Sequence, residues 1–325
     1  MTMPAHAGCR RLCRGLLVLS MMLGAMAARA DLHFLVPGGP GGGWDTTARA
    51  AGEALIKSGL ESNASFQNMS GGGGGRAIAY MIKMGTKQGD MVMINSTPIV
   101  LRALSGQIPN SFRDLKPVAN LIADYGAFVV TANSPYQSWE EVMDAYRRDP
   151  RLVKVAGGSA RGSMDHLVAA QAFQASGGDG RKLAYIPYDA GGQAKAGLLS
   201  GEVQLLSTGF SEALELMRSS DARILAITAP ETIADYPEIP TLKSLGYPMS
   251  FVNWRGLFAA PDTPDAKVAA YSAVFRKLLE TPEWEAVRKR NGWLNNYETP
   301  ERFLESLEQQ EEQMARVMRD LGFIR

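Results

Sequence analysis

Short apolar runs alternate with segments whose apolar positions recur every three to four residues, through most of the 325-residue chain. Short runs bounded by glycine or polar residues predict strands, and the longer spacing predicts helices. In the first part of the chain we expect strands at Leu32 to Val36, Ser65 to Asn68, Met91 to Ile94, Val118 to Ile122 and Ala127 to Thr131, with helices at Thr46 to Ser58, Arg76 to Lys83 and Thr97 to Leu104.

The alternation then restarts as a second unit. Its expected strands are Val153 to Ala156, Leu183 to Pro187, Val203 to Ser207 and Ile224 to Thr228, and its expected helices are Trp139 to Arg148, Met164 to Ala175, Gln193 to Leu199 and Ser211 to Met217. An extended segment, Phe251 to Ala259, returns toward the first unit and precedes helices at Pro264 to Glu280, Pro282 to Arg290 and Pro300 to Leu321.

This order of elements predicts an α/β protein with two lobes, each a mostly parallel sheet flanked by helices. Two crossings of the chain between the lobes form a hinge. We assign residues 31–126 and 254–325 to lobe 1 and residues 127–253 to lobe 2. In the last segment, Tyr271, Val274, Phe275 and Leu278 recur at helical spacing and are expected to be core contacts.

Glycine-rich junctions join the first two strands to their helices. The first reads Gly38-Gly39-Pro40-Gly41-Gly42-Gly43-Trp44-Asp45-Thr46-Thr47, and the second reads Met69-Ser70 followed by five glycines, Gly71 to Gly75. Because glycine has no Cβ, successive N–H groups can face one ligand, and the following helix adds partial positive charge. Parallel strands open on one edge, where α/β sheets bind ligands. The junctions predict a pocket for carboxylate groups, although either could be only a tight turn.

The second unit offers two further polar junctions, Gly157 to Ser163 and Tyr188 to Gly192. Ser159 and Ser163 can present hydroxyl groups to a ligand or cap the following helix, and these roles are compatible. Arg161 is the one cation of its loop and can grip a second carboxylate or form a solvated ion pair.

Two residues of the first junction have open roles. Trp44 can line the pocket or pack beneath it. Asp45 favours the first turn of a helix, as acidic residues do, or contacts a ligand hydroxyl or a bound cation.

The N-terminus has the features of a secretory signal peptide. Arg10, Arg11 and Arg14 precede the apolar stretch Gly15 to Ala27, and Ala28-Arg29-Ala30 fits a small-x-small cleavage site. Residues 1–30 are therefore expected to be removed after Ala30, and the apolar stretch is too short to favour a membrane anchor. Whether export follows the general or the twin-arginine route stays open.

Composition narrows the chemistry of the mature chain. Both cysteines, Cys9 and Cys13, lie in the leader, so disulfides, cysteine catalysis and zinc–thiolate sites are not expected. Removing the four leader arginines from the 34 basic side chains leaves 30 against 33 acidic ones, a formal charge of −3. The sequence has no stripe of basic residues of the kind that binds nucleic acid. Because the net charge is negative, any attraction of an anion must come from groups at the binding site itself. His33 and His166 lack metal-ligand spacing, so we expect neither a metal nor a cofactor.

Enzyme motifs are absent from the sequence. There is no Gly-x-Ser-x-Gly elbow or His-Glu-x-x-His motif, and position 44 is tryptophan where a phosphate-binding loop needs lysine. Gly72, Gly74 and Ala77 fit a loose dinucleotide fingerprint, but the acidic residue about 20 positions on is missing. A nicotinamide enzyme is therefore disfavoured.

The first junction resembles the signature of the substrate-binding proteins of tripartite tricarboxylate transporters, the Bug family. Its Trp44-Asp45 pair is closest to the tricarboxylate-binding, TctC-like branch. The resemblance continues through Asn68 to Gly75, Gly157 to Leu167, Tyr188 to Gly192, Pro240-Thr241-Leu242 and Asn253-Trp254-Arg255-Gly256. The second junction departs from the family, in which many relatives have a shorter loop with proline and alanine among the glycines.

The resemblance implies a two-lobed, venus-flytrap periplasmic receptor of type II-like fold, not an enzyme. It would close on a small carboxylate and deliver it to a two-subunit membrane permease; we expect a monomer. In the family the first two loops hold a carboxylate through backbone amides and ordered water, and loops of the second lobe complete the pocket. Carried over by matched position, the ligand-binding residues are Gly41, Gly42, Gly43, Ser70, Gly71, Gly72, Ser159, Ser163 and Asp189, to which we add Trp44, Asp45 and Arg161 as candidates.

By the Trp44-Asp45 resemblance the expected ligand is citrate or another tricarboxylate. A C4 dicarboxylate and an aromatic acid are the alternatives, because backbone amides recognise any carboxylate. A periplasmic sensor or adaptor for a signalling partner would use the same pocket, and the sequence does not separate it from a transport receptor.

Overall fold

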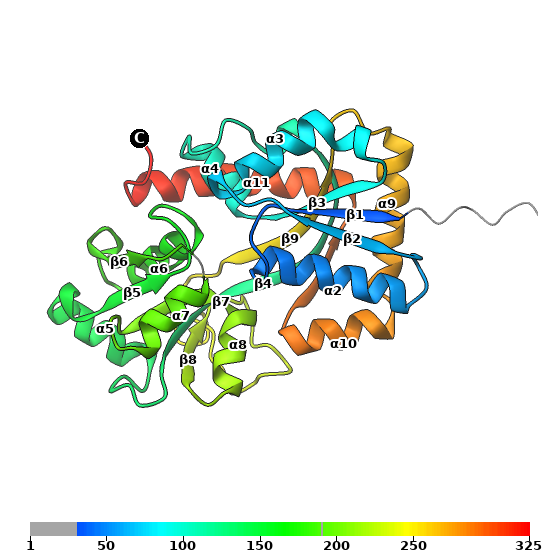
Figure 1. The fold of residues 1–325 in the computed structure, drawn as a ribbon. Coiled ribbons are helices and arrows are strands. Elements are labelled where there is room, and N and C mark those ends of the chain that lie inside the picture. The colour runs from blue at the N-terminus through cyan, green and yellow to red at the C-terminus, as the bar shows by residue number, and fades with distance from the viewer. Residues whose placement is uncertain (1–30, 190) are drawn as a thin grey trace, which may run out of the picture.

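The computed structural model describes residues 31–189 and 191–325, arranged as two lobes around one long shared strand (Figure 1). The predicted leader, with both cysteines, lies outside the described residues. Within the described part of the chain, no helix has the length and apolar character needed to cross a membrane.

Lobe 1 is built on a mixed sheet. Its strands are β1 (Leu32–Val36), β2 (Ala64–Asn68), β3 (Met91–Ser96), the first part of β4 (Lys116–Thr131), β9 (Val252–Ala259) and β10 (Leu294–Glu298). Strand β1 pairs in parallel with β2 and β3, whereas β9 runs antiparallel to β3 and β4, and β10 is antiparallel to β4. The helices of this lobe are α2 (Gly43–Lys57), α3 (Gly75–Met84), α4 (Pro98–Leu104), α9 (Asp265–Leu278), α10 (Pro282–Asn291) and α11 (Pro300–Asp320).

Lobe 2 repeats this plan with the rest of β4. Its other strands are β5 (Lys154–Gly157), β6 (Ala184–Pro187), β7 (Leu205–Gly209) and β8 (Ala222–Ile227), and its helices are α5 (Trp139–Arg148), α6 (Met164–Ala175), α7 (Gly191–Leu199) and α8 (Phe210–Arg218). Strand β5 is parallel to β6 and β7, and β4 runs antiparallel to β7 and β8. The α/β, two-lobed prediction is confirmed, but antiparallel strands next to the hinge make both sheets mixed rather than mostly parallel.

Strand β4 passes from one lobe to the other without a break. The prediction of two separate strands, at Val118 to Ile122 and Ala127 to Thr131, is wrong because the residues between them, Ala123 to Gly126, stay extended and paired. Asp124 is fully buried there and accepts hydrogen bonds from the backbone N–H of Tyr125 (3.0 Å) and the hydroxyl of Ser211 (3.1 Å). Gly126 leaves room for the close approach of Val168, which a Cβ would meet at 2.8 Å.

The second crossing of the chain lies beside the first. The N–H of Thr228 donates to the carbonyl of Gly126 (2.8 Å), and the Thr228 hydroxyl donates to the carbonyl of Phe251 (2.7 Å), just before β9 begins. The predicted pair of crossings at the hinge is therefore present, as β4 and the segment that enters β9.

Several boundaries differ from those predicted by pattern alone. Helix α2 begins at Gly43, three residues before the expected Thr46, so Trp44 and Asp45 lie in its first turn. Strand β7 begins at Leu205 rather than Val203. Strand β10 was not predicted, because Leu294–Glu298 is short and largely polar and is strand only through its pairing with β4.

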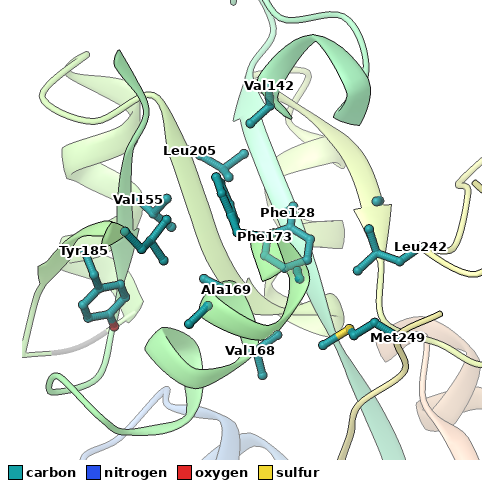
Figure 2. Close-up of a cluster of buried hydrophobic side chains, with 14 of the residues drawn as sticks. Phe128, Val142, Val155, Val168, Ala169, Phe173, Tyr185, Leu205, Leu242 and Met249 are labelled. Atoms are coloured by element: carbon teal, nitrogen blue, oxygen red, sulfur yellow. The ribbon is translucent and has the colours of Figure 1, made fainter. Parts of the chain in front are cut away.

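Each lobe has its own apolar core. In lobe 2, Figure 2 shows Phe128 of β4 and Phe173 of α6 near the centre of a buried cluster, with Tyr185 on one side and Met249 on the other. In lobe 1, Phe275 of α9 and its neighbours pack on the sheet; Phe275 and Leu278 are buried, and Tyr271 and Val274 are partly buried against the same cluster, as predicted from their spacing.

Helix α11 contributes to both cores. Phe303 and Leu307, near its start, pack in lobe 1, whereas Met314, Met318 and the following Leu321 pack with the cluster of Figure 2. In Figure 1 the red helix spans the top of the molecule and its C-terminal end lies above α6. The assignment of all of residues 254–325 to lobe 1 stays a prediction, and these contacts tie its C-terminal end to lobe 2.

Candidate functional site

A cavity of about 360 Å³ lies between the lobes, where the glycine-rich junctions of both lobes meet. Residues from the starts of α2 and α3, from α4 and β9 in lobe 1, and from the starts of α6 and α8 in lobe 2 line it. Of the predicted site residues, those that line the cavity are Gly42, Gly43, Trp44, Ser70, Gly71, Ser159, Ser163 and Asp189.

Four predicted residues do not line the cavity. Gly41 and Gly72 lie in the two glycine loops, one position away from residues that do line it. Arg161 points into lobe 2, where its guanidinium donates to the backbone carbonyl of Tyr185 (2.5 Å). Asp45 is 3% exposed and engaged by protein groups. Their ligand-binding roles stay predictions, and the contacts of Arg161 and Asp45 are those of residues that support the loops.

Asp45 holds the first loop in shape. Its carboxylate accepts hydrogen bonds from the backbone N–H of Gly41 (2.8 Å), the Nε of Arg49 (2.9 Å) and the Nδ2 of Asn68 (2.9 Å). Burial opposes ionisation, but these hydrogen bonds prevail and lower the pKa of Asp45 below its usual value. Gly41 has φ +78°, a left-handed conformation that favours glycine. The acidic residue thus joins the loop, helix α2 and the end of β2.

The indole of Trp44 packs between the two glycine loops. Its Nε1 donates to the hydroxyl of Ser96 at the end of β3 (2.8 Å). A Cβ on Gly38 would lie 3.0 Å from the ring and one on Gly74 would lie 3.6 Å from it. Trp44 therefore both lines the cavity and supports the loops, which were the two roles left open by the sequence.

The second loop has a backbone that depends on glycine. Gly71, Gly72, Gly73 and Gly74 all have positive φ, from +56° to +130°, which L side chains rarely adopt. The guanidinium of Arg102, from α4, lies directly against Gly73, where any Cβ would overlap with it. Because this loop has no side chains between Gly71 and Gly75, Arg102 can lie directly on its backbone, and a ligand could approach the backbone in the same way.

Arg255 lies in the same way against the first loop. A Cβ on Gly43 would stand 2.5 Å from its Nη2. The side chain, from β9, is 8% exposed, and its Nη2 is 3.6 Å from the carboxylate of Asp124. Burial lowers the pKa of Arg255, and the neighbouring carboxylates oppose this shift. The Nε atoms of Arg102 and Arg255 have no hydrogen-bond partner among the described residues.

Neither arginine was among the predicted site residues. Arg255 stands within the run Asn253-Trp254-Arg255-Gly256, which supported the family resemblance. That run was the feature of the sequence from which Arg255 could have been recognised as a site residue. Arg102 lies in the last turn of α4, and no motif in the sequence around it marks it as a site residue. Asn253 lines the cavity beside Arg255; it is 1% exposed, and neither polar atom of its side chain has a partner in the described chain.

The start of α6 forms the opposite wall. Ser159 accepts a hydrogen bond from the backbone N–H of Asp165 (3.2 Å), so it caps the helix. Ser163 occupies the N-cap position but makes no capping bond, and its buried hydroxyl is unpartnered among the described residues. His166 accepts a hydrogen bond from the N–H of Gly162 (3.0 Å) and stacks on Tyr185, which agrees with a structural role.

Acidic groups also stand at the cavity. Asp165 and Glu212 line it, and Asp124 adjoins it behind Arg255. Burial, reinforced by the negative charge of Glu212, raises the pKa of Asp165 to about 7. Burial likewise raises the pKa of Asp124, against the effect of Arg255. The described residues contain no cluster of three or more His, Cys, Asp or Glu side chains placed to hold a metal ion.

A two-lobed α/β fold with a polar cavity between the lobes is the architecture of a solute-binding receptor. Residues 49–323 match the family described as tripartite tricarboxylate transporter family receptor, and the chain belongs to this family. Its members are substrate-binding receptors and not enzymes.

Individual relatives agree with this assignment. Protein BugT of Bordetella pertussis is 29% identical over 241 residues, which cover 73% of this chain and 72% of BugT. Among solved structures, Rpa4515 of R. palustris with adipate has a TM-score of 0.80 at 21% identity, covering 90% of this chain and 97% of that one. MatC from Rhodopseudomonas palustris with bound malate has a TM-score of 0.76 at 20% identity, covering 88% and 98%. At these identities the two structures establish the shared fold.

Proposed function

We propose that this protein is exported to the periplasm, captures a small carboxylate between its lobes and delivers it to the two-subunit membrane permease of a tripartite tricarboxylate transporter. The family supports the receptor role, and the N-terminal leader pattern supports export. The proposed carboxylate site is the cavity between the glycine loops.

The single observation that carries the proposal is a set of unpartnered hydrogen-bond donors around the cavity. The Nε of Arg102, the Nε of Arg255, the Ser163 hydroxyl and the Asn253 amide are buried without partners in the described chain. A buried donor left unpaired costs about 1–3 kcal/mol, so four of them in one cavity favour a ligand that accepts hydrogen bonds. Arginine matches the two oxygens of a carboxylate.

Citrate or another tricarboxylate is the ligand that the Trp44-Asp45 signature favours. A dicarboxylate is the nearest alternative, and two structural relatives were solved with malate and adipate. An aromatic acid remains the third candidate. A sensor role would use the same cavity, and co-purification of the ligand-bound protein with a permease subunit or with a signalling protein would separate the two roles.

The first test is thermal melting of the exported, processed protein with citrate, tricarballylate, malate, succinate, adipate, glutamate and benzoate at fixed ionic strength. A ligand at about 100 times its dissociation constant adds roughly 2.7 kcal/mol of stability, which raises the melting temperature by several degrees in a protein of this size. No shift with any acid would overturn the carboxylate proposal.

Arg102→Met provides the matched variant for this test. Loss of one charge-assisted hydrogen bond, worth about 1.5–3 kcal/mol, should weaken binding of every carboxylate by roughly 10- to 100-fold. Arg316→Met is the control, because Arg316 is an exposed residue on α11 that pairs with Glu312 and lies outside the cavity lining. Equal affinities of Arg102→Met and the unaltered protein would contradict the proposed site.

A further inference from the structure

The lobe 2 side of the cavity is acidic. Two cations, Arg102 and Arg255, line the cavity together with three acids, Asp165, Asp189 and Glu212. A ligand made only of carboxylates is repelled by those of the three acids that are ionised, which at pH 7.5 include most of Asp165, because its pKa is about 7. Like charges brought together in a buried site disfavour each other's ionised forms.

The positive charge available to a ligand is also smaller than two arginines suggest. Arg255 already has Asp124 at 3.6 Å, and Asp124 is 0% exposed. The acid behind the arginine therefore neutralises part of its charge. Arg102 is the cation of the cavity that forms no ion pair with the described residues. This balance suits one carboxylate in lobe 1 better than the three of citrate, so the charges of the cavity argue against the tricarboxylate that the Trp44-Asp45 resemblance favours.

Glu212 is placed to accept a hydrogen bond from a ligand. It stands in the first turn of α8, and Gly191 and Gly209 lie against it, so that a Cβ on them would be 3.0 Å and 3.7 Å from its carboxylate oxygens. The Thr208 hydroxyl donates to Oε2. Glu212 makes no ion pair within the described chain, although basic side chains pair with acids at many other positions.

Asp165 adds a second acceptor on the same wall. It is 8% exposed in the first turn of α6 and forms no ion pair with the described residues. The cations that act on it electrostatically, Arg102 and Arg255, come from lobe 1, and Glu212 is the acidic group beside it. A ligand donor between Asp165 and Glu212 would relieve their mutual repulsion.

Resting on the proposed function, we propose that the ligand has two unlike ends: a carboxylate held in lobe 1 by Arg102, Arg255 and the glycine loops, and a hydrogen-bond donor, ammonium or hydroxyl, held in lobe 2 by Glu212 and Asp165. Such a ligand engages each lobe through the chemistry that lobe offers. A carboxylate at both ends satisfies lobe 1 and is repelled by lobe 2.

The test uses ligands that differ only at the far end. Butyrate, succinate, 4-hydroxybutyrate and 4-aminobutyrate share a four-carbon chain, and the corresponding five- and six-carbon series allow for the width of the cavity. Calorimetric titration of the exported protein at pH 7.5 and fixed ionic strength should show the amino or hydroxy acid of at least one length binding about 10-fold or more tightly than the dicarboxylate of that length. The comparison of amino and hydroxy acids identifies the donor.

Glu212→Gln provides the second arm. It should weaken the amino acid by about 10-fold or more and leave the dicarboxylate unchanged or strengthened, because the variant removes a negative charge that only the ammonium uses. If the hydroxy acid is the preferred ligand, the loss should be smaller and still confined to it. Glu215→Gln, one turn further on the same helix at an exposed residue paired with Lys195, should change neither.

The outcomes separate this inference from the function on which it rests. The two-ended ligand is excluded if the dicarboxylate of every chain length, or citrate, binds more tightly than the amino and hydroxy acids. It is also excluded if Glu212→Gln leaves the order of affinities among these ligands unchanged. In both cases a carboxylate receptor stands. If no carboxylate of any kind binds, the proposed function fails as well.

Discussion

Two arginines lie on bare glycine backbone at the cavity, and this arrangement depends on the absence of a Cβ atom from each glycine. Arg255 contacts Gly43 and Arg102 contacts Gly73 at positions where a Cβ would collide with the guanidinium. Glycine therefore has two functions in these loops. It permits the left-handed backbone of the second loop, and it allows a cation to approach the main chain as closely as a ligand could.

Asp165 makes the stability of the protein depend on pH. Its folded pKa of about 7 lies above the ordinary value of 3.8, so between these values the folded state holds a proton that the unfolded state has lost. The free energy of unfolding should therefore fall as pH rises from about 4 to 7, with a contribution of at most about 1.4 kcal/mol per pH unit from this group.

Asp165→Asn tests this sign. The variant lacks the titration, so its stability relative to the unaltered protein should increase with pH up to about 7 and then level off. Urea unfolding at pH 5, 6, 7 and 8 measures the difference, and a difference that does not vary with pH would contradict the assignment. Glu212, Arg102 and Arg255 face Asp165 and are unchanged in both proteins.

At the scale of elements, the start of α2 is organised by hydrogen bonds rather than by a conventional cap. Gly42 offers no side chain, and Asp45 in the first turn binds back to Gly41 and across to Asn68 on β2. One carboxylate thereby sets the shape of the first glycine loop. The acid favours the helix N-terminus as well, because of the helix dipole.

Asp45→Ala should destabilise the protein by about 1–3 kcal/mol, because the Gly41 N–H and the Asn68 amide lose the charged acceptor of their part-buried hydrogen bonds. Since Asp45 does not line the cavity, all ligands should lose affinity in similar proportion as the loop loosens. Chemical unfolding and ligand titration measure the two effects. Glu53→Ala, on the exposed face of the same helix, is the control and should cost less than about 0.5 kcal/mol. Stability equal to that of this control would refute the role of Asp45.

At the scale of the whole molecule, three segments of the described chain join the lobes. Strand β4 runs through both sheets, the chain crosses back at Phe251, and α11 packs its first turns in lobe 1 and its last turns in lobe 2. The guanidinium of Arg181 in lobe 2 also donates to the carbonyl of Asp320 at the end of α11. A change in the angle between the lobes must bend β4 and shift α11.

Ligand binding should bring the lobes together, because residues of both line one cavity and no single loop supplies enough binding energy. Micromolar affinity requires about 8 kcal/mol of net binding free energy after an association cost on the order of 4–15 kcal/mol has been met. One charge-assisted hydrogen bond contributes roughly 1.5–3 kcal/mol, so several contacts from both lobes are needed. Small-angle scattering should show a smaller radius of gyration with a saturating ligand than without one. An acid that does not raise the melting temperature is the control, and identical curves with a true ligand would rule out closure.

Much of the local structure could be predicted because it depends on neighbours in the chain. The limits of α5 and α6 agree with their spacing of apolar residues, and the positions of the glycine loops follow from composition alone. Eight of the predicted site residues line the cavity for the same reason: a polar junction after a strand lies at a known edge of an α/β sheet. Family membership could also be recognised from short runs of sequence.

The tertiary structure alone decided what depends on residues far apart in the chain. The direction of β9, the continuity of β4 through Asp124 and the strand β10 all follow from pairing partners, which no local pattern specifies. Arg102 looks like an ordinary helical residue until the fold places it on Gly73, and Arg255 meets Gly43 only because β9 returns to lobe 1. By itself the sequence determined where the bare glycine backbone lies and predicted that it binds an anion; the fold decided which side chains line the cavity beside it, because long-range contacts form only when the sheets assemble.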